Sequence, residues 1–157
     1  MEYDRRQCPP GIEIVAPESA DDLIRYFRLR WQLLREPWNQ PQGSEKDELE
    51  KVSHHLMART ADGEIVSVGR LHFPDVATAQ IRYMATKDSH RRRGIGAALA
   101  TRLENIAVTL GARTIVANAR EPAVPFYEKL GYRVCGDGQI LFGTIRHKRV
   151  EKLLADP

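Results

Sequence analysis

The chain contains few cysteines and no long apolar run. Among its 157 residues only Cys8 and Cys135 are cysteines, and their separation fits neither a zinc-binding pair nor a dense disulfide framework. No stretch is long and apolar enough for a membrane helix, and the N-terminal residues lack the apolar core of a signal peptide. We therefore expect a cytoplasmic protein with no metal site and no membrane partner. Cys8 lies in a segment that we expect to be a tail. Cys135 lies in an expected strand, where we expect it to be a small buried residue.

Two nucleotide-binding signatures are also missing. No glycine-rich loop ends in Gly-Lys-Ser or Gly-Lys-Thr, and Leu99 stands where the third glycine of a dinucleotide fingerprint would fall. The composition is otherwise that of a folded protein, with 42% hydrophobic residues, 29% charged residues and a net charge of +3. We expect residues 1–11 to form a lead-in and residues 12–157 to form one domain.

The segment that follows residue 78 predicts a strand, a basic loop and a helix. Apolar and polar residues alternate over Ala79–Thr86, as in a half-buried strand. Further on, apolar residues recur at three- and four-residue steps on one face of a helix: Ile95, Leu99, Leu103, Ile106 and Leu110. The loop contains Arg91–Arg93, and Gly94 and Gly96 stand at the helix start, where backbone N–H groups are free. This arrangement predicts a site for a phosphate or pyrophosphate group.

The remaining pattern predicts a single α/β domain. We expect a mixed, mostly antiparallel central sheet of about seven strands, flanked by about four helices. The other strands are expected over Ile12–Ala16, Ser53–Thr60, Glu64–Phe73, Thr114–Ala117, Tyr132–Cys135 and part of Ile140–Leu153. The other helices are expected over Ser19–Arg35, Ser44–Lys51 and Pro122–Leu130. Gly111 and Gly131 are expected to end helices, and Asp62-Gly63 and Gly136-Asp137-Gly138 to form turns. The polar run Arg146–Arg149 predicts an edge strand.

Two motifs resemble one protein family. Arg91-x-x-Gly94-x-Gly96 after a strand resembles the pyrophosphate-binding motif of the GCN5-related N-acetyltransferase (GNAT) family. About 30 residues further on, the run from Phe126 to Tyr132 (Phe-Tyr-Glu-Lys-Leu-Gly-Tyr) resembles the C-terminal half of the GNAT fold. The matching order of elements extends from Ile12 to Leu153, which is nearly the whole chain.

The resemblance implies an N-acetyltransferase. It implies transfer of an acetyl or other acyl group from acetyl-CoA to a primary amine of a small molecule or peptide, by direct attack in a ternary complex. The backbone of Met84, Ala85 and Thr86 is implied to bind the pantetheine arm, and an N–H there to polarise the thioester carbonyl. The implied pyrophosphate site consists of Arg91, Arg92, Arg93, Gly94, Ile95, Gly96 and Ala97.

Three downstream residues complete the implied site. By resemblance, Asn118 hydrogen-bonds the pantetheine arm, and Phe126 contributes to cofactor binding from the core side of its helix. Tyr127 matches the tyrosine that protonates the departing thiolate in many relatives, and so is implied to be the general acid. A phenol with an ordinary pKa of about 10 is protonated at neutral pH, which suits a proton donor. The alternative interpretation of Tyr127 is an amphipathic core residue.

The general base and the acceptor contacts stay open. Four residues are candidates for the base, although each also fits a structural or solvated role: His54, His55, His72 and Glu121. The acidic residues of the expected helix over Ser44–Lys51 would attract a cationic amine or form a solvated helix face: Glu45, Asp47, Glu48 and Glu50. Trp38 would contact such an amine or cover the edge of the core.

Two other functions are also open. One is a non-catalytic acyl-CoA-binding or sensor module, which would bind acyl-CoA through the same basic loop. The other is a nucleic-acid-binding domain that uses Arg91–Arg93 and Arg146–Arg149. The chain has no known nucleic-acid motif, however, and its basic residues are offset by 21 acidic ones, so we expect no nucleic-acid partner. An edge strand at the C-terminal end would allow a homodimer.

Overall fold

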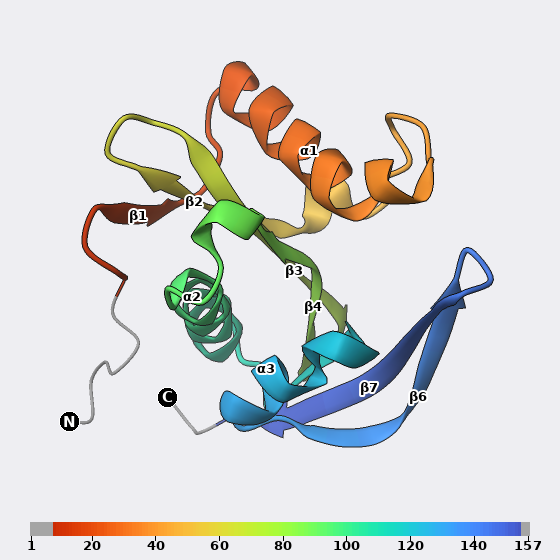
Figure 1. Cartoon of the computed structure of the whole chain (residues 1–157). Helices are drawn as coiled ribbons and strands as arrows, with labels where there is room; N and C mark the ends of the chain where they lie inside the picture. Colours follow the sequence, from red (N-terminus) through yellow and green to blue (C-terminus); the bar gives the residue numbers. More distant parts are fainter. Residues whose placement is uncertain (1–7, 155–157) are drawn as a thin grey trace. The chain divides into compact units, whose positions relative to one another are not determined.

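The computed structural model describes residues 8–154, in which seven strands form one mixed sheet (Figure 1). The strand order is β1-β2-β3-β4-β5-β7-β6. The strands are β1 (Ile12–Val15), β2 (His54–Thr60), β3 (Ile65–Asp75), β4 (Thr78–Thr86), β5 (Thr114–Arg120), β6 (Arg133–Leu141) and β7 (Ile145–Leu153). Strands β4 and β5 are parallel, whereas the β1–β2, β5–β7 and β6–β7 pairs are antiparallel. The predicted single α/β domain with a mixed sheet is confirmed.

Three α-helices connect the strands: α1 (Ala20–Leu34), α2 (Ile95–Thr109) and α3 (Val124–Lys129). Short 3-10 turns lie at η1 (Glu36–Trp38), η2 (Glu50–Val52), η3 (Asp88–His90) and η4 (Glu121–Ala123). The prediction of about four helices is therefore nearly right, but the expected helix over Ser44–Lys51 is wrong, because turns occupy that segment. The chain divides into two compact units: residues up to Arg70 with Tyr83–Leu103, and Leu71–Arg82 with the residues from Glu104 onward.

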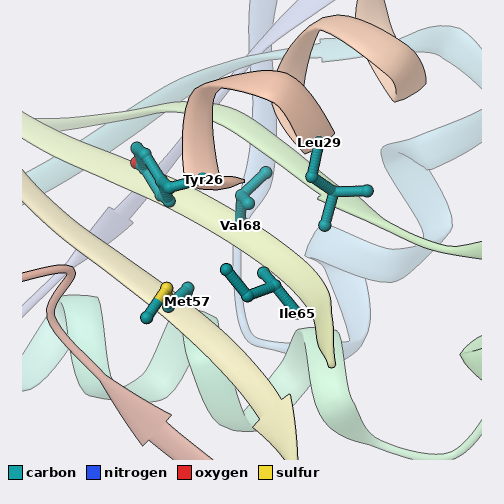
Figure 2. Close-up of a cluster of buried hydrophobic side chains, with 5 residues drawn as sticks. All are labelled: Tyr26, Leu29, Met57, Ile65 and Val68. Carbon is teal, nitrogen blue, oxygen red and sulfur yellow. The ribbon is translucent and has the colours of Figure 1, made fainter. Parts of the chain in front are cut away.

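In the first unit, α1 packs on the sheet through an apolar cluster. The helix begins after Ser19, whose Oγ accepts a hydrogen bond from Asp22 N at 3.0 Å, as expected for a helix N-cap. Figure 2 shows the cluster, in which side chains of α1 meet those of β2 and β3: Tyr26, Leu29, Met57, Ile65 and Val68. All five are buried, so this contact fixes α1 against the two strands.

Strand β3 contacts helices on both of its faces. Val68 belongs to the cluster under α1. A Cβ on the next residue, Gly69, would lie 2.5 Å from Met84 Sδ and 2.6 Å from Leu99 Cδ2 of α2. Because successive strand residues point to opposite faces, α1 and α2 cover opposite faces of β3 in this unit. The missing side chain of Gly69 lets Met84 and α2 approach the strand closely.

The predicted turns were correct in three of four places. Gly63 closes the β2–β3 hairpin with a φ of +89°, and Gly111 and Gly131, at +94° and +95°, follow α2 and α3. Only glycine adopts these φ values without strain. Gly136-Asp137-Gly138 does not form a turn, however; it lies within β6, and the chain reverses instead at Phe142-Gly143.

Gly138 has a packing role rather than a turn role. A Cβ built on it would lie 2.9 Å from His147 Cβ and 3.1 Å from His147 C on β7. The two strands approach too closely here for any side chain larger than hydrogen. Register shifts interrupt the β6–β7 pairing on either side of Gly136-Asp137.

We expect Gly138→Ala to destabilise the protein by about 1–3 kcal/mol, because the new methyl group must displace the β7 backbone. Gly136→Ala is the matched control, since its Cβ would have no neighbour within 4 Å. Urea unfolding of both variants measures the difference. If both variants lost the same free energy of unfolding, the β7 backbone would have moved aside without loss of stability, and the prediction would be wrong.

Other expectations about the second half of the chain were wrong. The edge strand is β6, not β7, because β7 pairs with β5 on one side and β6 on the other. Cys135 is exposed because it lies on that edge. Leu110 is 52% exposed and follows the last residue of α2, so the apolar helix face ends earlier than its spacing predicted.

Candidate functional site

The loop between β4 and α2 presents free backbone amides. The 3-10 turn Asp88–His90 leads into Arg92, with a φ of +62°, and Gly94, with a φ of +81°. The first intrahelical hydrogen bond of α2 runs from Ala98 N to Gly94 O at 3.0 Å. The three amides before it, those of Ile95–Ala97, therefore have no acceptor within the helix. Free amides of this kind, with the positive end of the helix dipole, are suited to bind an anion.

Positive charge and open space accompany these amides. Arg91, Arg92 and Arg93 are all exposed, and Arg91 Nε lies 3.1 Å from Asp88 Oδ1. A Cβ on Gly94 would meet only Pro9 Cγ, at 3.9 Å. This neighbour was not predicted from the sequence, because Pro9 was expected to lie in a loose lead-in. The predicted pyrophosphate loop thus has the charge, the amides and the room that the ligand needs.

The end of β4 is fixed from β3. Ser67 Oγ donates to Ala85 O at 3.0 Å and lies 2.8 Å from Thr86 Oγ1, and Lys87 N donates to Val66 O at 2.8 Å. Met84, Ala85 and Thr86 are half-buried. The backbone bends just before them, because Tyr83 has a φ of +58°.

The remaining implied site residues belong to the second unit. Asn118 is half-buried on β5, opposite Arg149 of β7. On α3, Tyr127 is 6% exposed and Phe126 is only half-buried, so the expectation that Phe126 takes the core side was wrong. The Tyr127 ring makes edge-to-face contacts with the rings of Phe126 and Tyr132, at centroid distances of 5.1 and 5.3 Å.

The Tyr127 hydroxyl is available as a proton donor. It has no hydrogen-bond partner within residues 8–154. Burial raises the pKa of Tyr127 well above its ordinary value, because the charged phenolate is poorly solvated there. The side chain is therefore a neutral phenol at physiological pH.

The acidic segment before β2 binds arginines instead of facing solvent as a helix. Arg70 donates to both Asp47 oxygens, at 2.6 and 3.0 Å, and Glu50 Oε2 accepts from Nη1 of Arg30 and of Arg70, each at 2.9 Å. We call Arg30, Asp47, Glu50 and Arg70 the buried ion cluster. Burial acts to lower the pKa of Arg70, but the two carboxylates outweigh it and the pKa lies above its ordinary value. The prediction of a solvated helix face was wrong for Asp47 and Glu50, whereas attraction of a cationic amine stays a prediction.

His55 is engaged at both ring nitrogens. Nε2 lies 2.8 Å from Glu50 O, which can only accept, so Nε2 carries the proton. Nδ1 lies 2.9 Å from the Tyr26 hydroxyl oxygen, whose single proton is donated to Gly69 O at 3.0 Å. Burial lowers the pKa of His55 and raises the pKa of Tyr26 to about 12, so both are neutral. Both ring nitrogens of His55 thus lie against groups of the first unit, Glu50 O and the Tyr26 hydroxyl.

The other candidates for the base lie in different surroundings. His54 is a half-buried residue of β2 in the first unit. In the second unit, His72 is 8% exposed on β3 and Glu121 is exposed in η4. Trp38 is 38% exposed, in η1. The first unit also has a half-open cavity of about 340 Å³ between α1 and residues 42–46, which the sequence did not indicate; Phe27, Trp31 and Lys46 line it.

Residues 8–154 contain no group of three His, Cys, Asp or Glu side chains that could hold a metal ion. Within the same range, no helix is long and apolar enough to cross a membrane.

A profile of the Acetyltransferase (GNAT) family matches residues 23–132. The chain belongs to the GNAT family. It is 32% identical over 142 residues to the "Uncharacterized N-acetyltransferase YjcF" of Bacillus subtilis (strain 168), covering 90% of this chain and 99% of that one. GNAT enzymes use acetyl-CoA or another acyl-CoA as acyl donor.

Solved structures share the fold. A putative N-acetyltransferase from Lactobacillus plantarum superposes with a TM-score of 0.80 at 20% identity, covering 92% of this chain and 99% of that one. An aminoglycoside 6'-N-acetyltransferase complexed with coenzyme A superposes with a TM-score of 0.73 at 16% identity, covering 93% and 98% of the two chains.

Proposed function

We propose that the protein is an N-acetyltransferase that transfers an acetyl group from acetyl-CoA to a primary amine of a small molecule or peptide. The observation that carries this proposal is the open first turn of α2. Three amides without intrahelical acceptors follow Gly94, beside the exposed Arg91–Arg93. Their charge and donors match the pyrophosphate of coenzyme A. Membership of the GNAT family and the coenzyme A complex of a structural relative support this choice of ligand.

Several segments of the chain would share the binding of this ligand. The loop Arg91–Ala97 would hold the pyrophosphate, and the backbone of Met84–Thr86 would hydrogen-bond the pantetheine arm. Asn118 and Phe126 stay predicted contacts of the cofactor, as the resemblance to the family implies. Acetyl-CoA, when bound, supplies an acyl group activated as a thioester. The N–H of Ala85 would polarise its carbonyl, which makes the carbon a better target for an amine.

We further propose that Tyr127 gives a proton to the leaving thiolate. In direct attack, a C–N bond forms while the C–S bond breaks; Tyr127 supplies one proton to sulfur, the amine releases one proton to solvent, and the Tyr127 phenolate recovers a proton from solvent. The raised pKa of Tyr127 and its hydroxyl without an intramolecular partner support this role. A homodimer also stays a prediction, through β6 as the edge strand.

Thermal unfolding with and without acetyl-CoA tests the proposed ligand. Acetyl-CoA at about 100 times its Kd is expected to stabilise the native state by about 2.7 kcal/mol, which raises Tm by about 5–10 °C. Free nucleotides and a short RNA serve as controls. A rise with RNA and none with acetyl-CoA would contradict the proposal.

A panel of primary amines then tests for transfer. Release of the coenzyme A thiol in the presence of one amine, and an acetylated product of the right mass, are the expected results. Binding of acetyl-CoA with no turnover on any amine would favour the alternative function, a non-catalytic acyl-CoA sensor.

A further inference from the structure

Strand β4 has an unusual backbone conformation at Tyr83. A φ of +58° lies in the left-handed region, which an aromatic residue rarely adopts. A residue keeps such a conformation only where its surroundings hold it there. Tyr83 is 8% exposed and immediately precedes Met84 and Ala85, the proposed contacts of the acyl thioester. The groups that surround the Tyr83 side chain therefore also decide the direction of this strand end.

Three guanidinium groups surround the Tyr83 ring. Cζ of Arg30 lies 4.2 Å from the ring centroid, Cζ of Arg70 lies 4.9 Å away and Cζ of Arg35 lies 5.7 Å away. The side chains of Arg30 and Arg70 are fully buried. A cation at a ring face is attracted by the ring quadrupole, and more strongly where water is excluded. The ring is thus held from both α1 and β3.

Carboxylates from the α1–β2 connection fix the two buried guanidinium groups. Asp47 binds Arg70 with both of its oxygens, and Glu50 Oε2 bridges Arg70 and Arg30. A two-oxygen pair fixes the plane of a guanidinium as well as its position. The orientation of the groups against Tyr83 is therefore set by the connection between α1 and β2.

Stability alone does not account for the buried ion cluster. Within the described part of the chain, Arg30 Nε and Glu50 Oε1 are buried without hydrogen-bond partners. Unsatisfied buried polar atoms lower stability, and apolar side chains of similar volume often serve at least as well as a buried ion pair. A cluster with this cost, in contact with the side chain of a residue whose backbone is strained, indicates a positioning role.

We propose that the buried ion cluster (Arg30, Asp47, Glu50 and Arg70) consists of positioning residues that hold Tyr83 in its left-handed conformation and so aim the backbone N–H groups of Met84 and Ala85. This inference rests on the proposed function, because the cluster would set the geometry of the β4 end that is proposed to bind acetyl-CoA. It also couples the α1–β2 connection to β4: a displacement of Asp47 or Glu50 changes how the strand end is presented.

The test uses variants that disturb the cluster in different ways. Arg30→Lys keeps the charge but loses the planar group over the ring, and Asp47→Asn keeps the shape but loses the charge that pairs with Arg70. Ile14→Ala is the stability control, since Ile14 is buried in β1 of the same unit and lies opposite Ala58, outside the cluster. If Arg30→Lys does not fold, Glu50→Gln replaces it.

Kinetics and binding give the first readout. We expect Arg30→Lys and Asp47→Asn to lower kcat at least about 10-fold with the Kd for coenzyme A changed less than about twofold, because the pyrophosphate loop is outside the cluster. Ile14→Ala is expected to keep kcat within about twofold below its melting temperature. Wild-type kcat in both cluster variants would overturn the inference.

A second readout needs no activity. In the free protein, the ¹H–¹⁵N amide resonances of Met84 and Ala85 are expected to move in Arg30→Lys and Asp47→Asn and to stay in place in Ile14→Ala. Unmoved resonances overturn the inference whatever the kinetics show. A wild-type protein that binds no coenzyme A overturns the proposed function instead, and the resonances then decide the inference by themselves.

Discussion

Tyr127→Phe is expected to lower kcat about 100-fold or more, while the Kd for acetyl-CoA changes less than about twofold. The substitution removes only the hydroxyl, which has no partner within residues 8–154, so the edge-to-face packing with Phe126 and Tyr132 is kept. Loss of the proton donor leaves a poorly protonated thiolate as leaving group. Thiol release under saturating amine gives kcat, and calorimetry gives Kd.

Tyr132→Phe is the control for this prediction. Tyr132 is also a buried tyrosine of the second unit, but its hydroxyl donates to Glu104 Oε2 at 2.8 Å, and Lys152 Nζ binds the other oxygen of that carboxylate at 2.9 Å. This variant is expected to lose stability, by about 1–3 kcal/mol, and to keep its kcat. An unchanged kcat in Tyr127→Phe would exclude Tyr127 as the donor, and a solvent molecule would then have to protonate sulfur.

Gly94→Val is expected to weaken acetyl-CoA binding at least about 10-fold, or by about 1.4 kcal/mol. A β-branched residue at a φ of +81° is strained, so the loop relaxes and its amides turn away from the pyrophosphate. The new side chain also fills the space in front of the first turn of α2. Calorimetric titration with acetyl-CoA measures the change.

Gly63→Val provides the matched comparison. Gly63 belongs to the same unit, has a φ of +89° and, like Gly94, has no close neighbour to a Cβ. Both variants are expected to lose about 1–2 kcal/mol of stability to backbone strain, but only Gly94→Val is expected to lose affinity. Equal affinities in the two would remove the Arg91–Ala97 loop from the proposed site.

The sequence predicted the elements well where local chemistry determines them. Ser19 caps α1, Gly63 closes a hairpin and Gly111 ends α2, and in each case one residue and its immediate neighbours decide the outcome. The alternation over Ala79–Thr86 and the spacing from Ile95 likewise placed β4, α2 and the loop between them. These are also the parts that carry the resemblance to the GNAT family.

Contacts between distant segments account for what the sequence did not predict. Gly138 resembles a turn glycine, but it lies within a strand, where the close approach of His147 on another strand leaves no room for a side chain. Asp47 and Glu50 resemble surface residues of a helix, and their partners are Arg70, 23 and 20 residues further along the chain, and Arg30. A local sequence pattern does not predict either of these partners, because both lie far from Asp47 and Glu50 in the chain. The left-handed Tyr83 was missed for the same reason, because an aromatic residue in an alternating run predicts regular strand.

The irregular edge strand β6 affects how copies of the protein meet in concentrated solution. An edge strand offers unpaired N–H and C=O groups on which another chain can add a strand, and repeated addition leads to fibrils. Val134 and Ile140 are exposed on this strand, which would favour such growth. The register shifts between Val134 and Gly136 and between Asp137 and Ile140 interrupt the pleat. They shorten the regular stretch on which a second chain can pair, so the same irregularities disfavour open-ended growth at this edge.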